Sequence, residues 1–452
     1  MLEAYLNFIR RVLPSPFSIA VALTGLTFIL VGAYQLSYGE FQPGEIVKWW
    51  QTGMWDTSLM KFSVQMMLML VLGHALSLTP AADKLIEKLT GLCNSNAQAV
   101  WVVCSSAMLM SLFNWGLGLI FGAILARKVA ESFAERGKPM NYPLMAAAGY
   151  GGLMVWHGGL SGSALIKAAE PNGVSSLYAG LSAPVPNVPL SLTLFSAENL
   201  ITTGVVVVMV PAVLYLVARK FPLSLLDLSR AVNEEEPNHP KPIGAEKMDH
   251  SRTVALLTGS AILGLALWIY AGVHNLKTSF FTPDNINLTL LGLAILLHKN
   301  FTGFMRAIRH AIPGASGILI QFPLYFGIMG LIANSGLIER FSELVVTYSS
   351  ENTLGLFTMV SAGIVNLFVP SGGGQWVVQG PIVIKACELL RVPFEKGILA
   401  LAYGDQLTNM IQPFWALPLL GITGLSARDI LPYTLIMFGA GAIVFGIGVF
   451  IF

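Results

Sequence analysis

The chain has 452 residues, of which 54% are hydrophobic and 11% are charged, and its mean hydropathy is +0.68. Soluble globular proteins carry roughly 25% charged residues, so this composition excludes a soluble fold and predicts a polytopic membrane protein. The net charge of +2 offers no basic field for nucleic acid. The three cysteines, Cys93, Cys104 and Cys387, lack CxxC spacing and predict neither a disulfide framework nor a metal site.

The apolar segments have the length of membrane helices, which predicts an all-α fold. We expect the first to be a retained spanning helix rather than a cleaved signal peptide. The polar segment 218–252 predicts a cytoplasmic linker between an N-terminal half, 1–217, and a C-terminal half, 253–452. The apolar segments fall at 17–36, 59–80, 97–126, 141–166, 191–217, 253–274, 285–298, 312–333, 354–384, 397–424 and 431–452.

Two of these segments, 97–126 and 354–384, are longer than one span needs and shorter than two spans with a turn. Each is interrupted near its middle, at 114–118 (Asn-Trp-Gly-Leu-Gly) and at 370–374 (Pro-Ser-Gly-Gly-Gly). We predict that both are re-entrant hairpins with an irregular tip near mid-membrane, which leaves about nine spanning helices. The alternative is one long tilted helix with a glycine kink.

The placement of Lys and Arg favours the hairpins. With a cytoplasmic N-terminus and two re-entrant hairpins, 18 of the 26 basic residues lie on the cytoplasmic side and 8 outside. A full span at 97–126, with 354–384 still re-entrant, would place the basic linker 218–252 outside. Lys385, Arg391 and Lys396 are exceptions to this positive-inside rule, because the predicted topology places them outside.

The two halves align as an internal duplication. Residues 65–69 lie over 321–325 at an offset of 256, and Asn114 lies over Asn366 at an offset of 252. In the predicted topology the aligned helices run in opposite directions, so the repeats are inverted. Inverted repeats with broken helices are typical of secondary transporters, with the substrate site at the midplane. No Walker A motif supports an ATP-driven pump.

The motifs of both halves resemble the bacterial short-chain fatty acid transporter family. This resemblance implies an elevator-type carrier in the bacterial cytoplasmic (inner) membrane, with a scaffold, a mobile domain carrying the two hairpins, and usually a homodimer. A possible departure is His157, where the family pattern leads us to expect a small residue. The similar strings are Gly73–Leu76, Asn114–Gly116, Ser161–Ser163, Asn366–Pro381, Ala402–Gln406 and Gln412–Pro418.

The hairpin tips are the candidate anion site. A short-chain fatty acid is a carboxylate with a small apolar tail, and the sequence has almost no Lys or Arg near the tips. Helix N-termini with free N–H groups can bind the anion instead. The glycines of 371–375 allow close backbone approach, although flexible-loop or helix-packing glycines are the alternative. The expected substrate-binding residues are Asn114, Trp115, Gly116, Ser161, Gly162, Ser163, Asn366, Ser371, Gly372, Gly373, Gly374, Gln375, Asn409, Gln412 and Pro413.

Segments 141–166 and 397–424 are expected to be broken helices, because the first holds a Gly/Ser run and the second holds Pro413. Their freed carbonyls are candidate Na⁺ ligands, whereas a simple kink is the alternative. Asp405 and His157 are the candidate coupling-ion residues, although each could be structural. Trp115, Trp376 and Trp415 could line the aliphatic tail, or simply pack.

The predicted function is secondary transport of acetoacetate- or butyrate-like monocarboxylates coupled to H⁺ or Na⁺. The alternative is a carrier of this architecture for dicarboxylates or other small anions; a passive channel is a further alternative. We expect no enzyme, because His74, His157 and Asp405 are the only plausible catalytic set and no catalytic motif accompanies them. We expect no cofactor beyond Na⁺ as a coupling ion, and the expected partners are a small organic anion and the lipid bilayer.

Overall fold

The computed structural model describes residues 14–39, 41–91, 93–170, 173–174, 188–221, 223–225, 244–272 and 283–451. These residues are mainly helical, with an isolated bridge between Met140 and Ser224. The predicted all-helical fold is thereby confirmed, whereas most of the linker predicted at 218–252 lies outside the described residues.

The helices and 3₁₀ turns follow in chain order. They are α2 (Pro16–Ser37), α3 (Pro43–Met54), α4 (Thr57–Ser77), α5 (Pro80–Gly91), α6 (Asn96–Phe113), α7 (Trp115–Glu135), α8 (Tyr142–Tyr150), η1 (Gly151–Met154), η2 (Trp156–Gly158), α9 (Ser163–Ala169), α10 (Ala197–Ala218), α11 (Glu246–Asp249), α12 (Arg252–Gly272), α13 (Pro283–His298), α14 (Phe301–Ala311), η4 (Ile312–Ala315), α15 (Ser316–Ser335), α16 (Leu337–Thr347), α17 (Leu354–Phe368), α18 (Gly372–Leu390), α19 (Phe394–Thr408), η5 (Asn409–Ile411), α20 (Pro413–Thr423) and α21 (Ala427–Ile451).

Seven stretches of the described chain are long and apolar enough to cross a membrane. The expected count of nine spans stays a prediction. The seven are Pro16–Ser37, Pro43–Ser77, Asn96–Phe113, Ala197–Ala218, Arg252–Tyr270, Phe301–Ser335 and Ala427–Ile451.

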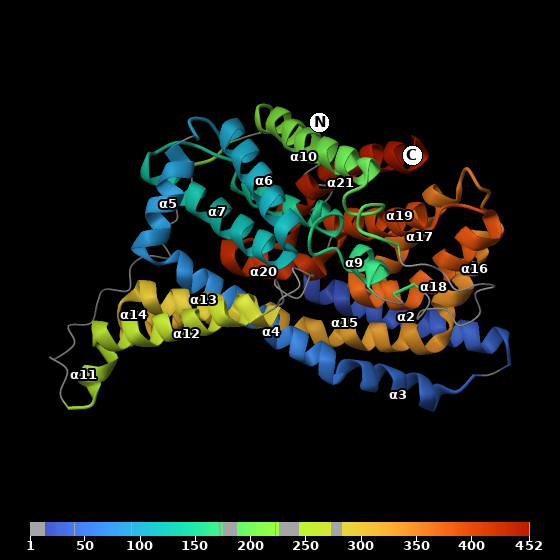
Figure 1. The fold of residues 1–452 in the computed structure, drawn as a ribbon, viewed down its shortest axis with the longest axis horizontal. Coiled ribbons are helices and arrows are strands. Elements are labelled where there is room, and N and C mark those ends of the chain that lie inside the picture. Colours follow the sequence, from blue (N-terminus) through green and yellow to red (C-terminus); the bar gives the residue numbers. More distant parts are fainter. Residues whose placement is uncertain are drawn as a thin grey trace.

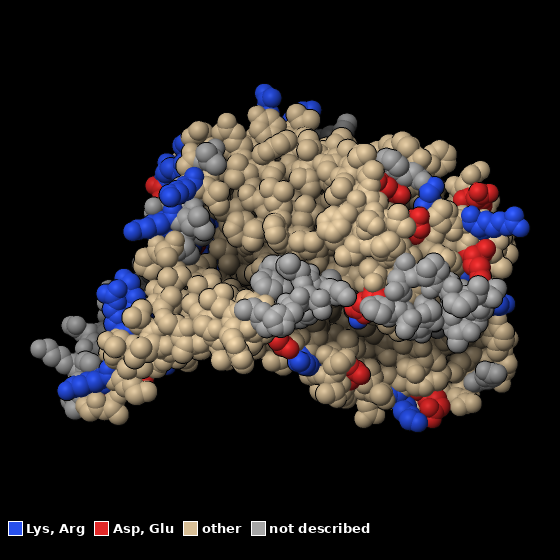
Figure 2. All heavy atoms as spheres, in the orientation of Figure 1, with Lys and Arg blue, Asp and Glu red and all other residues tan. Residues whose placement is uncertain are grey.

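Large apolar side chains point outward from several of these helices. Ile29 of α2, Leu257 and Trp268 of α12 and Ile447 of α21 are all more than half exposed. In Figure 2 the charged residues lie mainly at the margins of the molecule, around a broad uncharged middle. A surface this apolar is unfavourable in water, so it fits a lipid environment.

Two groups of helices pack separately and then meet (Figure 1). The framework group, α2, α3, α4 and α12–α15, lies in the lower part of the view; the hairpin group, α6–α10 and α17–α21, lies mainly above it. The groups are in contact where α4 packs on α7 and where α15 packs on α20. Through these contacts, helices from the first half of the chain (α4 and α7) and from the second half (α15 and α20) meet between the two groups.

Each segment predicted as a hairpin is broken into two antiparallel helices. In the first, the pairs Ser111–Gly118 and Ala107–Gly122 lie in contact across the break at Asn114. In the second, Gln375 and Gln379 of α18 donate to Ala362 O and Ser361 Oγ of α17. The predicted breaks therefore lie at the turns of two helical hairpins.

The second arm of each hairpin is longer than predicted. The expected ends at 126 and 384 directly precede charged residues, yet α7 continues to Glu135 and α18 to Leu390. In α7, Arg127 pairs with Glu131 at 3.0 Å, and in α18 Lys385 pairs with Glu388 at 3.0 Å. Because oppositely charged residues three or four apart support a helix, the charges extend these arms instead of ending them.

The contact between α7 and α8 allows no side chain at Gly122. A Cβ there would overlap the carbonyl oxygen of Gly149, and a Cβ at Gly149 would overlap the carbonyl oxygen of Gly122. We therefore expect Gly122→Ala to destabilise the protein by about 1–3 kcal/mol through overpacking, measured as a lower melting temperature in detergent. The control is Gly446→Ala in α21, where a Cβ would meet nothing within 4 Å. Equal melting temperatures for the two variants would contradict this packing.

Candidate functional site

The tip of the first hairpin satisfies its own N–H groups. Asn114 is extended, with φ −154° and ψ 127°, and its Oδ1 accepts from Gly116 N and Leu117 N at 3.0 Å. Trp115 N donates to Ser161 Oγ at 3.1 Å, and Gly118 N donates to Asn114 O at 2.9 Å. Since the four N–H groups of the first turn of α7 all have acceptors, this turn has no free backbone donor for an anion in this conformation.

The tip of the second hairpin has spare donors. Ser371 caps α18, because its Oγ accepts from Gly374 N at 3.2 Å and its carbonyl accepts from Gln375 N at 2.7 Å. Among the described residues, the N–H groups of Gly372 and Gly373 have no acceptor. A Cβ on Gly373 would meet only Ser163 Oγ, 4.0 Å away. The second tip therefore combines two free N–H groups with open space beside the Ser163 hydroxyl.

Gly372 brings the second tip onto the broken helix of the first half. A Cβ on Gly372 would lie 2.7 Å from Trp156 Cη2, 2.9 Å from His157 Cε1 and 3.0 Å from Asp405 Oδ2. Contacts this short leave no room for any side chain at residue 372. The glycine is therefore required for the tip to cover the ionisable pair below it.

His157 and Asp405 form that buried pair. His157 Nδ1 lies 3.1 Å from Asp405 Oδ2, and their side chains are 0% and 1% exposed. The two atoms are at ion-pair distance but are not aligned as a hydrogen bond. Ala164 N donates to His157 Nε2 at 3.0 Å, so a neutral ring carries its proton on Nδ1, toward Asp405.

Gln406 fixes the backbone beside this pair. Its Oε1 accepts from His157 N at 3.0 Å and from Gly158 N at 3.2 Å. The first broken helix then turns through Gly159, which is extended, and Gly162, which precedes α9. Ser163 begins α9, and Ser161 is already bonded to the first tip.

The polar groups at the second break are hydrogen-bonded to Asn366 of α17. Asn366 Nδ2 donates to Asp405 O at 2.9 Å and lies 3.0 Å from both Thr408 Oγ1 and Asn409 Oδ1. Gln412 Nε2 donates to Asn366 O at 2.8 Å. The buried oxygens Asn366 Oδ1 and Gln412 Oε1 have no partner in the described chain. Uncharged oxygens of this kind are suitable ligands for Na⁺.

Segment 397–424 is broken where expected, between Thr408 and Pro413, and Pro413 is the first residue of α20, where its missing N–H has no cost. The Gln375 side chain turns away from the tip into the hairpin, where Nε2 donates to Ala362 O at 2.8 Å.

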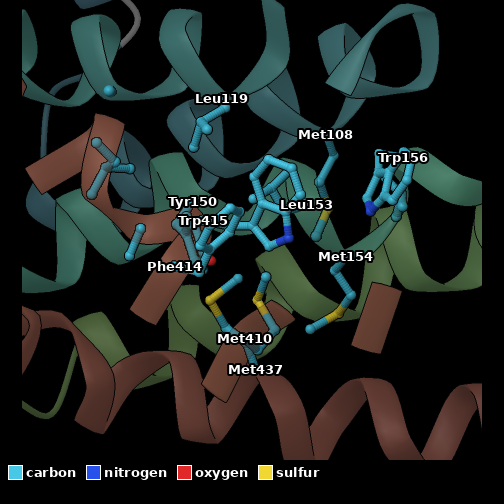
Figure 3. Packing of buried hydrophobic residues seen from close by; sticks show 14 of the residues in the cluster. Met108, Leu119, Tyr150, Leu153, Met154, Trp156, Met410, Phe414, Trp415 and Met437 are labelled. Atoms are coloured by element: carbon cyan, nitrogen blue, oxygen red, sulfur yellow. The ribbon is translucent and has the colours of Figure 1, made fainter. Parts of the chain in front are cut away.

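Aromatic residues from the two halves surround the first tip. The ring centroids of Trp115 and Trp415 are 4.9 Å apart, those of Trp115 and Phe62 are 6.0 Å apart, and those of Trp115 and Trp156 are 6.2 Å apart. Figure 3 shows Trp156, Phe414 and Trp415 within one cluster of buried residues. Sequence reasoning missed Phe62 and Trp156; the position of Trp156 next to His157 and a Gly/Ser run was the available signal.

A cavity of about 240 Å³ adjoins the second break, lined by Tyr150, Met410, Gln412, Pro413 and other largely apolar residues. It contains no residue of either hairpin tip. Tyr150 OH donates to Asn409 O at 2.8 Å on the same side of the break.

The family model and the two relatives found by sequence comparison name the same family. A family model described as short chain fatty acid transporter matches residues 1–452. A relative from Escherichia coli is 35% identical over 99% of this chain and 98% of its own, and one from Haemophilus influenzae is 36% identical over 98% and 97%. Each is named as a candidate short-chain fatty acid transporter.

Two solved transporters are distant structural neighbours. The YdaH transporter of Alcanivorax borkumensis is 15% identical with a TM-score of 0.42, covering 96% of this chain and 98% of its own. MtrF of Neisseria gonorrhoeae is 13% identical with a TM-score of 0.38, covering 98% and 97%. With the full-length family match and the apolar helices, the sequence comparisons lead to one conclusion: the chain is a multi-pass membrane protein that belongs to the short-chain fatty acid transporter family.

Proposed function

We propose that this protein is a secondary active transporter of short-chain monocarboxylates, such as butyrate or acetoacetate, in the bacterial cytoplasmic membrane. The observation that carries the proposal is the pair of unpaired N–H groups on Gly372 and Gly373 at the start of the 19-residue helix α18. An anion at a helix N-terminus is stabilised by these donors and by the helix dipole. The carboxylate binds there without a buried cation.

The remaining parts of the substrate have complementary surroundings. The Ser163 hydroxyl lies beside the open space at Gly373 and the Ser371 hydroxyl lies beside Gly374, and both supply further donors to the carboxylate. The aromatic cluster of Trp115, Trp415 and Phe62 offers an apolar wall for a short aliphatic tail. This combination of few polar donors and an apolar wall is typical of small-molecule sites.

The transport mechanism follows from the two groups of helices. We treat the hairpin α6–α7 with the break after η2 as one repeat unit, and the hairpin α17–α18 with the break at Gln412 as its inverted copy. In this proposal the hairpin group is the mobile transport domain of an elevator-type mechanism, and it carries the substrate across the membrane relative to the framework group. The framework group is the fixed scaffold and also forms the homodimer contact. Lys and Arg gather at the left end of Figure 2, near α5, α11 and α14, and we assign this end to the cytoplasm.

Two ion sites are available for coupling. His157 and Asp405 exchange a proton when the second tip moves away from them. Asn366 Oδ1 and Gln412 Oε1, with nearby carbonyls, are oxygens that a Na⁺ ion uses as ligands. Both sites lie at or directly behind the second hairpin, so either ion is positioned to respond to movement of the tip.

The first prediction concerns the reaction itself. Purified protein in proteoliposomes is expected to take up labelled butyrate saturably, and the uptake is expected to respond to an imposed Na⁺ or pH gradient. The two gradients are imposed separately, which identifies the coupling ion. If no acid of two to six carbons is taken up or exchanged under either gradient, the proposed function is wrong.

The second prediction concerns the anion donors. Gly373→Val is expected to abolish uptake, because the side chain fills the space beside the free N–H groups. Gly264→Val in α12, where a Cβ would meet nothing within 4 Å, is the control and is expected to retain activity. Ser371→Ala is expected to raise the KM for butyrate about tenfold, because it removes a hydroxyl hydrogen bond to the charged carboxylate that is worth about 1.5 kcal/mol. Wild-type kinetics in both Gly373→Val and Ser371→Ala would remove the second tip from the site.

The third prediction concerns coupling. Asp405→Asn keeps the shape of the side chain but removes its ionisable group, so accumulation driven by the ion gradient is expected to be lost while exchange of internal for external butyrate remains. Asp56→Asn at the exposed N-cap of α4 is the control, since asparagine caps a helix as well as aspartate. Full gradient-driven accumulation by Asp405→Asn would exclude this carboxyl from coupling.

A further inference from the structure

Trp156 connects the parts of the site that the two halves contribute. Its ring stacks on His157, with centroids 4.4 Å apart and planes 21° apart, and it meets Trp115 of the first tip at 6.2 Å. Its Cη2 atom lies 2.7 Å from where a Cβ on Gly372 would be, so the same indole also touches the second tip. Trp156 is 4% exposed. One side chain therefore contacts both hairpin tips and the ionisable pair.

The indole N–H of Trp156 has no acceptor. Nε1 is buried and without a hydrogen-bond partner among the described residues. An indole nitrogen can only donate, and a buried indole usually finds an acceptor because an unpaired donor is costly. An acceptor from outside the described chain would satisfy this donor, and an anionic oxygen is the strongest one available.

A second tryptophan shows what a purely structural unpaired indole looks like. Trp50 Nε1 in α3 is also buried and without a partner. There, however, Gly327 of α15 packs onto the nitrogen, since its Cβ would lie 2.5 Å from Nε1. Trp50 belongs to the framework group, away from the tips and from the ionisable pair. It therefore serves as a matched control rather than a second site.

We propose that Trp156 is a substrate-contacting, specificity-determining residue whose Nε1–H donates a hydrogen bond to the carboxylate of the transported acid. This inference rests on the proposed function, because it places the carboxylate at Gly372 and Gly373. The donor favours a carboxylate over a neutral amide of the same length, since a hydrogen bond to a charged oxygen is stronger than one to a neutral oxygen.

The test compares Trp156→Phe, Trp50→Phe and wild type in proteoliposomes. Phenylalanine keeps an aromatic ring but removes the N–H donor together with part of the indole surface, and Trp50→Phe controls for that loss of surface. Trp156→Phe is expected to raise the KM for labelled butyrate about tenfold with Vmax largely retained, which corresponds to the loss of one hydrogen bond to a charged group. Inhibition by butyramide, the neutral amide, is expected to change little. Trp50→Phe is expected to match wild type in both measurements.

A second measurement uses the wild-type protein, so it does not depend on whether a variant folds or transports. In protein labelled with ¹⁵N at the tryptophan indoles, one of the nine indole N–H signals is expected to move downfield on addition of butyrate and not of butyramide. If Trp156→Phe folds and has the wild-type KM, or if no indole signal responds to butyrate that is transported, the inference is wrong and the proposed function stands. If wild type takes up no short-chain acid, the proposed function fails and this inference fails with it.

Discussion

The contact of Gly372 with Trp156, His157 and Asp405 is the constraint on which the site depends. It joins the tip of the second hairpin to the broken helix of the first half, and it is made with no side chain between them. Because the contact buries the ionisable pair at 0% and 1% exposure, the proposed proton exchange requires movement of the tip. In the proposed carrier, this glycine contact is the link between the ion and the conformational change.

The two hairpin tips differ in their unused hydrogen bonds. In the first, Asn114 and Ser161 accept hydrogen bonds from the N–H groups of the first turn of α7. In the second, the serine cap reaches only Gly374, and the two preceding N–H groups have no acceptor among the described residues. Unsatisfied donors are available to an anion, so this asymmetry supports the proposal that the anion binds at the second tip. The first tip then contributes shape and aromatic surface through Trp115.

The sequence predicted the position of the breaks better than the direction of the side chains. Glycine, proline and asparagine interrupt a helix for local reasons, so the breaks at Asn114, at Gly159–Gly162 and at Gln412 could be located from composition. That Gln375 turns into its hairpin depends on which neighbour is nearest in space, and no local pattern encodes this. The turn of Asn114 onto its own helix is instead a local N-cap, which asparagine favours. The charges at Arg127 and Lys385 were misleading for a related reason: they end an apolar run, but their ion pairs continue the helix.

Trp156 illustrates the same limit. Its sequence neighbours marked an interruption, but only the folded structure brings an indole from residue 156 against a glycine at 372 and leaves the N–H without an acceptor. Long-range contacts between the two halves decide which of many tryptophans lies in the site. Membrane helices contain many small and aromatic residues that serve packing alone, so composition cannot distinguish a packing residue from a substrate-binding residue.

The most direct measurement of the central claim is the position of a bound carboxylate, located by anomalous diffraction from crystals that contain 4-bromobutyrate. The account predicts a carboxylate oxygen within about 3.2 Å of the backbone nitrogen of Gly372 or Gly373, with the bromine toward Trp115 and Trp415. A carboxylate bound instead in the cavity beside Tyr150 and Met410, or at a surface Lys or Arg, would contradict the account.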